Sequence, residues 1–324
     1  MWSGREKSVH AATPSQPTMC FAIHLLQKWH SRHHFGITSP IKDQGEDLVE
    51  FHPPPRLLQA GFQPNDTNIL VQSVSGDMIH CQLTYPYDKP TSVNDYKSTN
   101  SIVLFMHGNA DDVHSSRSYC QWLADALDLK VISFDYPEYG FSSGDSTSEE
   151  GMLEAADCAF ELITNKLKCE VSEVVLCGKS IGSFPAVSLA ARSYCARIRG
   201  LVLISPVSSA ARCVFDTTFV PNYLMHKLDS LALNNLSEIS KVWCLVLLVH
   251  GKQDKLVLVD NSEALLLATN YHSQHPVLYV DAGHNDIESR QFRHQALFLE
   301  TLSNFVQTCM QNLDSTSSAS PYEF

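Results

Sequence analysis

Short apolar segments alternate with helical segments through most of this chain, and this alternation limits its fold more than any other feature. Strands are expected at 101–106, 130–136, 172–177, 199–204, 242–249 and 276–280, with helices at 113–129, 149–167, 181–192, 262–269 and 290–311 between or after them. Strands that are apolar throughout are typical of a parallel sheet buried by helices on both faces. Two alternating runs, 69–74 and 78–85, are joined by Ser-Gly-Asp and predict an N-terminal antiparallel hairpin. The fold class is therefore α/β, with a mostly parallel sheet.

The 324 residues allow one large domain or two ordinary ones. We expect a single domain over 61–312, in which 205–241 forms a small lid insertion. Residues 1–60 contain several prolines and are expected to be irregular. Within them, 19–35 predicts a helix that either docks on the domain surface or lies in a membrane interface. The Ser-rich segment 313–324 is expected to be a disordered tail.

The strongest motif is the sequence Gly178-Lys-Ser-Ile-Gly182, which lies between an expected strand and an expected helix. A serine on such a sharp turn projects its hydroxyl from the sheet, and the flanking glycines make room for the turn. Ser180 is therefore the candidate nucleophile. A phosphate-binding loop ending in Gly-Lys-Ser would need glycine at position 173, where the chain has Glu173.

A serine nucleophile needs a base and an acid that orients the base. His284 follows the last expected strand and is the candidate base, while Asp254 follows the strand before it and is the candidate acid. Other acidic residues compete for the second role, namely Asp260, Asp281 and Asp286. Asp281 and Asp286 are so near His284 in sequence that they could not easily approach it from a separate loop. We therefore favour Asp254.

The tetrahedral intermediate of such a reaction needs backbone N–H donors for its oxyanion. One donor is expected from Ile181, the residue after the nucleophile, and the other from the loop after the first parallel strand. In that loop, His107-Gly-Asn-Ala110, either Asn109 or Ala110 could donate, and the sequence leaves the choice open. His107 is expected to hold the loop in place.

Six segments together resemble the alpha/beta-hydrolase superfamily: LFMHGNADD, FDYPEYGFSSGDSTSE, GKSIGSFPAV, LVLISPV, LLVHGKQD and DAGHNDIE. They are most similar to the branch that includes the alpha/beta-hydrolase-domain protein depalmitoylases. The resemblance implies that Ser180, Asp254 and His284 act as nucleophile, acid and base on acyl thioesters of palmitoylated cysteines. Depalmitoylases of this group carry a lipidated N-terminal cysteine cluster, whereas Cys20 is the only cysteine in the first 80 residues here. Cys20 is thus a candidate lipidation site, and the 19–35 helix a candidate second membrane signal.

The predicted function is that of a serine hydrolase which cleaves acyl esters or thioesters through an acyl-enzyme, with a protein depalmitoylase as its most specific form. The alternatives are a small-ester or lipid esterase, a serine aminopeptidase-like hydrolase, and a non-catalytic binding scaffold. An acylated protein or a lipid or ester is the expected substrate. The oligomeric state stays open.

The amino-acid composition limits the classes of binding partner and the cellular locations that are expected for this protein. Lys and Arg number 23 against 35 Asp and Glu, so the net charge of −12 argues against nucleic-acid binding. None of the 10 cysteines forms a C-x-x-C pair, and the chemistry needs no metal or organic cofactor. The sequence contains neither a signal-peptide pattern nor an apolar run of about 20 residues. We therefore expect a cytoplasmic protein that is not secreted, with peripheral membrane contact through its N-terminal segment.

Overall fold

A computed structural model of the chain describes residues 67–87, 101–144, 147–215, 220–270, 275–288 and 294–316. The expected N-terminal segment 1–60, with its helix at 19–35 and Cys20, lies outside these residues, as does 317–324. In the part that is described, no helix is both long and apolar enough to cross a lipid bilayer.

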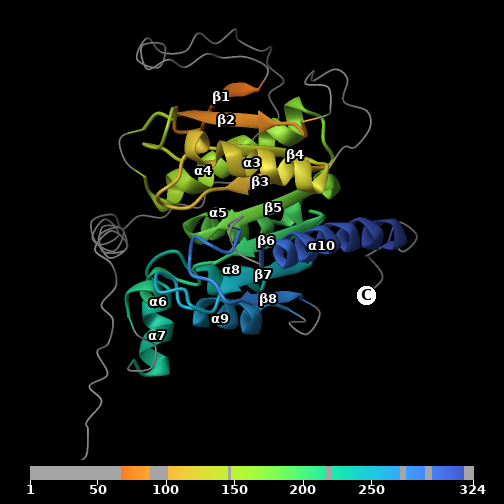
Figure 1. Ribbon diagram of the computed structural model, residues 1–324. Helices are drawn as coiled ribbons and strands as arrows, with labels where there is room; N and C mark the ends of the chain where they lie inside the picture. Colours follow the sequence, from red (N-terminus) through yellow and green to blue (C-terminus); the bar gives the residue numbers. More distant parts are fainter. Residues whose placement is uncertain are drawn as a thin grey trace, which may run out of the picture.

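One eight-stranded sheet forms the centre of the described chain (Figure 1). Its strands are β1 (Asn68–Gln72), β2 (Met78–Thr84), β3 (Ile102–Met106), β4 (Lys130–Phe134), β5 (Val174–Lys179), β6 (Gly200–Ile204), β7 (Val246–Gly251) and β8 (Val277–Val280). Their spatial order is β1-β2-β4-β3-β5-β6-β7-β8. The strands from β3 to β8 pair in parallel, and the β1–β2 hairpin joins the edge of β4 in antiparallel fashion. The predicted hairpin and the mostly parallel sheet are confirmed.

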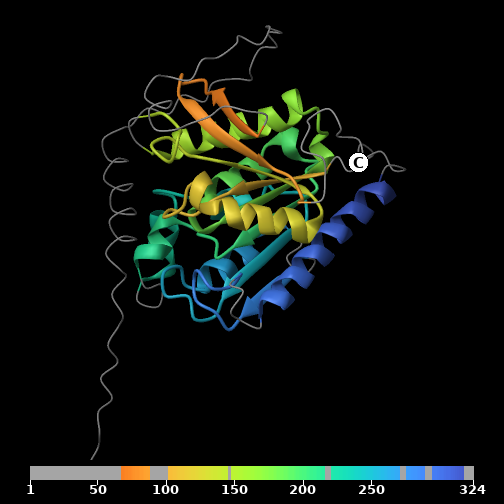
Figure 2. The same cartoon turned by 45° about the horizontal axis from the view of Figure 1, so that its top comes forward.

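Helices cover both faces of the sheet, and two apolar cores result. The helices are α3 (Val113–Leu127), α4 (Glu149–Glu161), α5 (Ser183–Ala190), α6 (Ala210–Val214), α7 (Asn222–Asp229), α8 (Asn235–Ile239), α9 (Asp260–Ala268) and α10 (His294–Thr316). Side chains of α3 and α10 share one core, and those of α4, α5, α8 and α9 share the other. Figures 1 and 2 show α3 and α10 on the same side of the sheet.

The period of a strand explains why both cores are apolar. Along β3, Val103 and Phe105 enter the core of α3 and α10, whereas Ile102, Leu104 and Met106 enter the opposite core. Successive side chains of a strand point to opposite faces, so a strand buried on both sides must be apolar at every position. The parallel strands of this sheet are therefore continuous apolar runs in the sequence.

The expected lid, 205–241, divides into two parts. The helix α7 stands out from the rest of the described chain (Figure 1), while α6 begins with two buried alanines, Ala210 and Ala211. In contrast, α8 packs against α5 and α9, and its Ile239 is fully buried in the core. Parts of the predicted insertion therefore contribute apolar side chains to the core of the domain. The role of 205–241 as a lid stays a prediction.

Several element boundaries also differ from the sequence prediction, among them those of β7, α4 and α10. β7 begins at Val246 and not at 242, and Trp243 in the apolar run before it is 72% exposed. The expected helix 149–167 is α4 followed by a π-helical turn, Leu162–Lys166. At the other end, α10 continues to Thr316, four residues into the expected tail. No Pro or Gly interrupts the chain there, so nothing local ends the helix at 312.

Candidate active site

Ser180 lies on the sharp turn between β5 and α5 that the motif predicts. Its φ of +53° is in the left-handed region, which is strained for a residue with a side chain. A Cβ atom on Gly178 would lie 2.6 Å from the carbonyl oxygen of Gly182. A Cβ atom on Gly182 would lie 2.7 Å from the carbonyl oxygen of His107. Both glycines are thus required by close backbone contacts, and the turn pushes Ser180 out at the carboxyl end of β5.

His284 reaches Ser180 from the loop that follows β8. Its Nε2 atom lies 3.0 Å from the Ser180 Oγ atom, and its Nδ1 atom lies 2.7 Å from Oδ2 of Asp254. A carboxylate can only accept at Nδ1, so Nδ1 carries the proton and Nε2 is free to accept from the serine hydroxyl. The structure thus brings together the three side chains that the sequence singled out.

Asp254 follows β7, and its side chain is fully buried. Its Oδ1 atom accepts hydrogen bonds from the backbone N–H groups of Leu256 and Val257, each at 2.9 Å. Burial raises the pKa of this carboxyl, but hydrogen bonds from His250 and His284 and from the backbone outweigh burial and lower the pKa. Asp254 is therefore ionised at neutral pH and can stabilise a protonated His284.

The three other carboxylates that were candidates for orienting His284 lie at different positions in the structure. Asp260 is the first residue of α9, and Asp281 accepts from the side-chain amide of Gln253. Asp286 lies beside Gly283, whose Cβ would be 2.9 Å from an Asp286 oxygen. Asp254 is the candidate whose carboxylate lies within hydrogen-bond distance of His284 Nδ1.

His250 is a further member of this site that the sequence prediction missed. It is the next-to-last residue of β7 and is fully buried. Its Nε2 atom lies 2.8 Å from the Val257 carbonyl oxygen and 3.3 Å from Asp254 Oδ2, and its Nδ1 atom lies 2.6 Å from Ser262 Oγ. Nε2 therefore donates and Nδ1 accepts from the serine hydroxyl. A histidine in a strand that is otherwise apolar, VLLVHG, was the available signal, because a buried imidazole needs polar partners.

The loop after β3 lies against the nucleophile. A Cβ atom on Gly108 would be 3.7 Å from Ser180 Cβ. The next residue, Asn109, accepts hydrogen bonds from the Tyr139 hydroxyl at its carbonyl oxygen (3.1 Å) and its side-chain oxygen (2.9 Å). Ala110 is exposed. The loop is thus held at Asn109, directly after the glycine that lies next to the serine.

Buried His107 begins this loop and makes contacts of a structural kind. Its Nδ1 atom donates to the Gly108 carbonyl oxygen at 2.8 Å, and its own carbonyl oxygen accepts from the Tyr136 hydroxyl at 3.0 Å. Burial lowers the pKa of the His107 imidazole, so the ring is neutral at pH 7. These contacts fit the expectation that His107 holds the loop.

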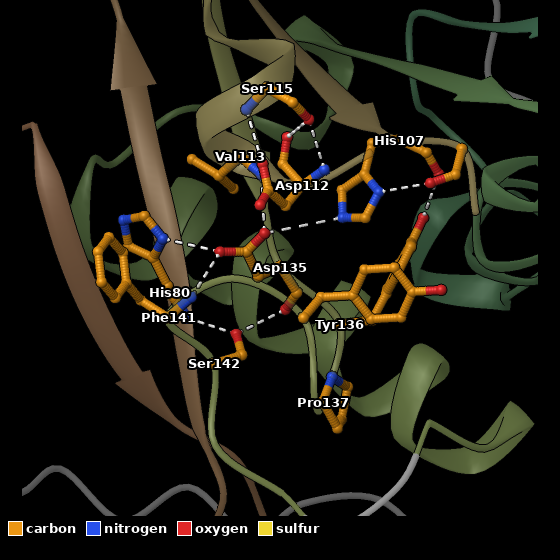
Figure 3. A network of polar contacts seen from close by, with 12 residues as sticks. His80, His107, Asp112, Val113, Ser115, Asp135, Tyr136, Pro137, Phe141 and Ser142 are labelled. Carbon is orange, nitrogen blue, oxygen red and sulfur yellow. Dashed lines mark hydrogen bonds and ion pairs between the residues drawn. The ribbon is translucent and has the colours of Figure 1, made fainter. Parts of the chain in front are cut away.

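Asp135, directly after β4, joins this loop to the edge of the sheet (Figure 3). Its carboxylate is 1% exposed and accepts from Val113 N–H at 2.7 Å, from His80 Nδ1 at 2.9 Å and from Phe141 N–H at 3.2 Å. Val113 is the first residue of α3, Phe141 belongs to the loop after β4, and His80 lies in β2. One buried carboxylate therefore fixes three segments around the site.

Comparisons with known proteins agree with this fold. The model of the serine aminopeptidase S33 family matches residues 97–243. Alpha/beta hydrolase domain-containing protein 17B of Xenopus laevis is 33% identical over 217 residues, which cover 67% of this chain and 69% of that protein. The human protein 17C is 32% identical over 216 residues, or 66% of this chain and 60% of that protein. The chain therefore belongs to the alpha/beta-hydrolase family, as its motifs predict.

The aligned segment spans about three fifths of the length of the 17C proteins of mouse, cattle and human. Solved structures show the same fold at low identity. The esterase Pf2001 of Pyrococcus furiosus has a TM-score of 0.58 at 16% identity, covering 86% of this chain and all of that one. The alpha/beta hydrolase GrgF of Penicillium has a TM-score of 0.59 at 11% identity, covering 76% and 99%.

Proposed function

We propose that this protein is a serine hydrolase that cleaves acyl esters and thioesters, with Ser180 as nucleophile. One observation carries the proposal. The Ser180 hydroxyl, on a strained turn at the end of β5, lies 3.0 Å from Nε2 of a histidine whose Nδ1 is 2.7 Å from a buried carboxylate. A serine hydroxyl is a weak nucleophile by itself, and a base at this distance removes its proton during attack.

The reaction then proceeds in two halves. The Ser180 oxygen attacks the acyl carbonyl carbon while its proton moves to His284 Nε2, and Asp254 stabilises the imidazolium. When the tetrahedral intermediate collapses, His284 gives this proton to the departing alkoxide or thiolate, which leaves as the alcohol or thiol, and the acyl group stays on Ser180. A water molecule next loses a proton to His284 and attacks the acyl-enzyme, which releases the acid and restores Ser180.

Two backbone N–H groups are proposed to bind the oxyanion of each intermediate. Ile181 follows the nucleophile on the same turn. For the second donor we choose Asn109 over Ala110, because Gly108 lies against Ser180 and places the next peptide group beside the reacting carbon. The Tyr139 hydroxyl holds Asn109 in this orientation. Donors fixed before the reaction stabilise the developing charge without reorganisation.

For the substrate, we propose an acyl thioester of a palmitoylated protein cysteine. Support comes from the sequence motifs, which resemble those of the protein depalmitoylases, and from relatives at 32–33% identity among the alpha/beta hydrolase domain-containing proteins 17B and 17C. A thiolate is a good leaving group, so the same site suits thioesters as well as oxygen esters. The second candidate, an aminopeptidase-like or small-ester hydrolase, is favoured by the match to the serine aminopeptidase family model.

Labelling with a fluorophosphonate probe tests the nucleophile. We expect the wild-type protein to be labelled and Ser180→Ala to remain unlabelled, because the probe bonds only to an activated serine. Ser183→Ala is the matched control, since Ser183 lies one turn later and its hydroxyl is directed to the Ser180 carbonyl oxygen. Equal labelling of wild type and Ser180→Ala, or none in either, would contradict the mechanism and favour a binding scaffold.

Comparison of kcat/KM values tests the substrate. The assay sets a long-chain S-acyl cysteine peptide against a short p-nitrophenyl ester and an aminoacyl amide. A higher kcat/KM on the long-chain thioester is expected. Preference for the short ester would refute depalmitoylation while leaving the serine hydrolase in place, and preference for the amide would select the aminopeptidase-like activity.

We also propose a cytoplasmic location with peripheral membrane contact through Cys20 and the segment 19–35. One acyl chain gives only marginal membrane binding, so the segment must supply the second signal. Fractionation of cells expressing wild type, Cys20→Ser and a variant lacking 19–35 tests this idea. Equal membrane fractions in all three would contradict it.

A further inference from the structure

The loop that carries His284 is fixed at its beginning by the turn after β7. The Gln253 N–H group donates to the Ala282 carbonyl oxygen at 2.9 Å, and the Gln253 side-chain amide donates to Asp281 Oδ1. These contacts hold the two residues that follow β8. These contacts do not reach the part of the loop after His284, so other contacts must fix its position.

The far end of this loop is fixed by an ion pair to the nucleophile turn. The Lys179 ammonium contacts the Glu288 carboxylate, and the two side chains are 13% and 8% exposed. Lys179 immediately precedes Ser180, and Glu288 lies four residues after His284. One ion pair therefore joins the segment of the nucleophile to the segment of the base, which are more than 100 residues apart in the sequence.

The surroundings of this pair separate it from ordinary surface ion pairs. Lys179 continues the row of Val175 and Cys177 on β5, which faces α3 and α10. There the ammonium lies over the ring of Tyr119, 5.7 Å from its centroid. The second carboxylate oxygen of Glu288 is buried and has no hydrogen-bond partner among the residues that the structure describes. Loss of Lys179 would therefore leave a poorly solvated carboxylate, which is costly.

We propose that Lys179 and Glu288 are a positioning pair, which clamps the His284 loop to the nucleophile turn and thereby sets the distance between His284 Nε2 and Ser180 Oγ. The inference rests on the proposed function, since only a serine–histidine reaction depends on that distance. The ion pair itself takes no part in proton transfer. Its effect comes from geometry, because a displacement of about 1 Å between reacting groups can lower a rate by about 100-fold.

The test compares Lys179→Met, Glu288→Gln and the charge-exchanged double variant Lys179→Glu/Glu288→Lys with the wild type. Each protein is assayed for kcat and KM on a p-nitrophenyl ester and for its second-order rate of fluorophosphonate labelling. We expect each single variant to lower kcat and the labelling rate by about 10-fold or more, with KM within about twofold. The charge-exchanged variant should recover both to within about threefold of wild type, because the attraction is restored.

Lys241→Met is the matched control, because Lys241 makes an exposed ion pair with Glu238 far from Ser180 in sequence. It should behave as wild type. If Lys179→Met fails to fold, Glu288→Gln and the charge-exchanged variant still test the inference. The inference is overturned if folded single variants keep wild-type labelling rates, or if the exchanged variant is no faster than they are. A wild type that is not labelled at all would instead overturn the proposed function.

Discussion

Replacement of Gly182 by alanine tests how tightly the nucleophile turn is packed against the loop after β3. Gly182 has an ordinary right-handed φ of −61°, so alanine adds no backbone strain of its own. The added Cβ would lie 2.7 Å from the His107 carbonyl oxygen and closer still to that of Met106. Normal contact is about 3.3 Å, so the turn and the loop must separate by roughly 1 Å.

Two magnitudes follow from this displacement. Overpacking against backbone that cannot rotate away costs about 3 kcal/mol. In a domain of this size, that corresponds to a fall in Tm of about 6–12 °C. The same displacement moves Asn109 away from Ser180, so we expect kcat to fall by about 100-fold, with a smaller change in KM. Differential scanning calorimetry and ester hydrolysis below the Tm measure the two effects separately.

Gly76→Ala is the control for this experiment. Gly76 has a φ of +93° in the β1–β2 turn, and a Cβ there would meet nothing within 4 Å. Alanine at Gly76 therefore tests backbone strain alone, at a cost of about 1–2 kcal/mol and with kcat unchanged. If Gly182→Ala matched Gly76→Ala in both Tm and kcat, the reasoning from close packing would be refuted.

Four further outcomes are expected. Asp254→Asn should lower the free energy of unfolding at neutral pH. This loss of stability should shrink below about pH 4, because a carboxyl with a lowered pKa contributes its full stabilisation only above the ordinary Asp pKa. A loss that does not change with pH would contradict this reasoning. His250→Leu should lower kcat/KM by about 10-fold by removing a donor to Asp254, and an unchanged value would exclude that role. Arg212→Met should lower the free energy of unfolding, measured with denaturant, by about 3 kcal/mol, because buried Asp229 loses its positively charged partner. A loss below about 0.5 kcal/mol would contradict this. Burial raises the pKa of the half-buried Cys213 thiol to about 12. Native-state iodoacetamide treatment at about pH 8 should therefore leave it unalkylated by mass spectrometry, and rapid alkylation would contradict the raised pKa.

The parts of the site that follow strands could be predicted, because their signals are local. A motif between a strand and a helix locates Ser180, and residues after the last two strands must reach the same sheet edge. His284 and Asp254 were therefore within reach of sequence reasoning. Their contact depends on the loops, and the structure supplies the distances.

Contacts between distant segments could not be predicted in the same way. Asp135 meets His80 and Val113, which are 55 and 22 residues away, and nothing in their spacing indicates the pairing. Similarly, no local signal within 205–241 shows which helix of this segment packs into the core. Burial of Ile239 against α5, a tertiary effect, decides that α8 belongs to the domain.

The position of Asp135 has a consequence for how far this domain can be shortened. The β1–β2 hairpin occupies the sheet edge most remote in strand order from β8, and a designer seeking a minimal scaffold would remove it first. His80 of that hairpin shares its carboxylate partner with Val113, at the end of the loop that lies against Ser180. Deletion of the hairpin would thus unbalance a buried charge beside the catalytic loop. We therefore expect shortened or circularly permuted versions of this domain to need the hairpin joined to β4.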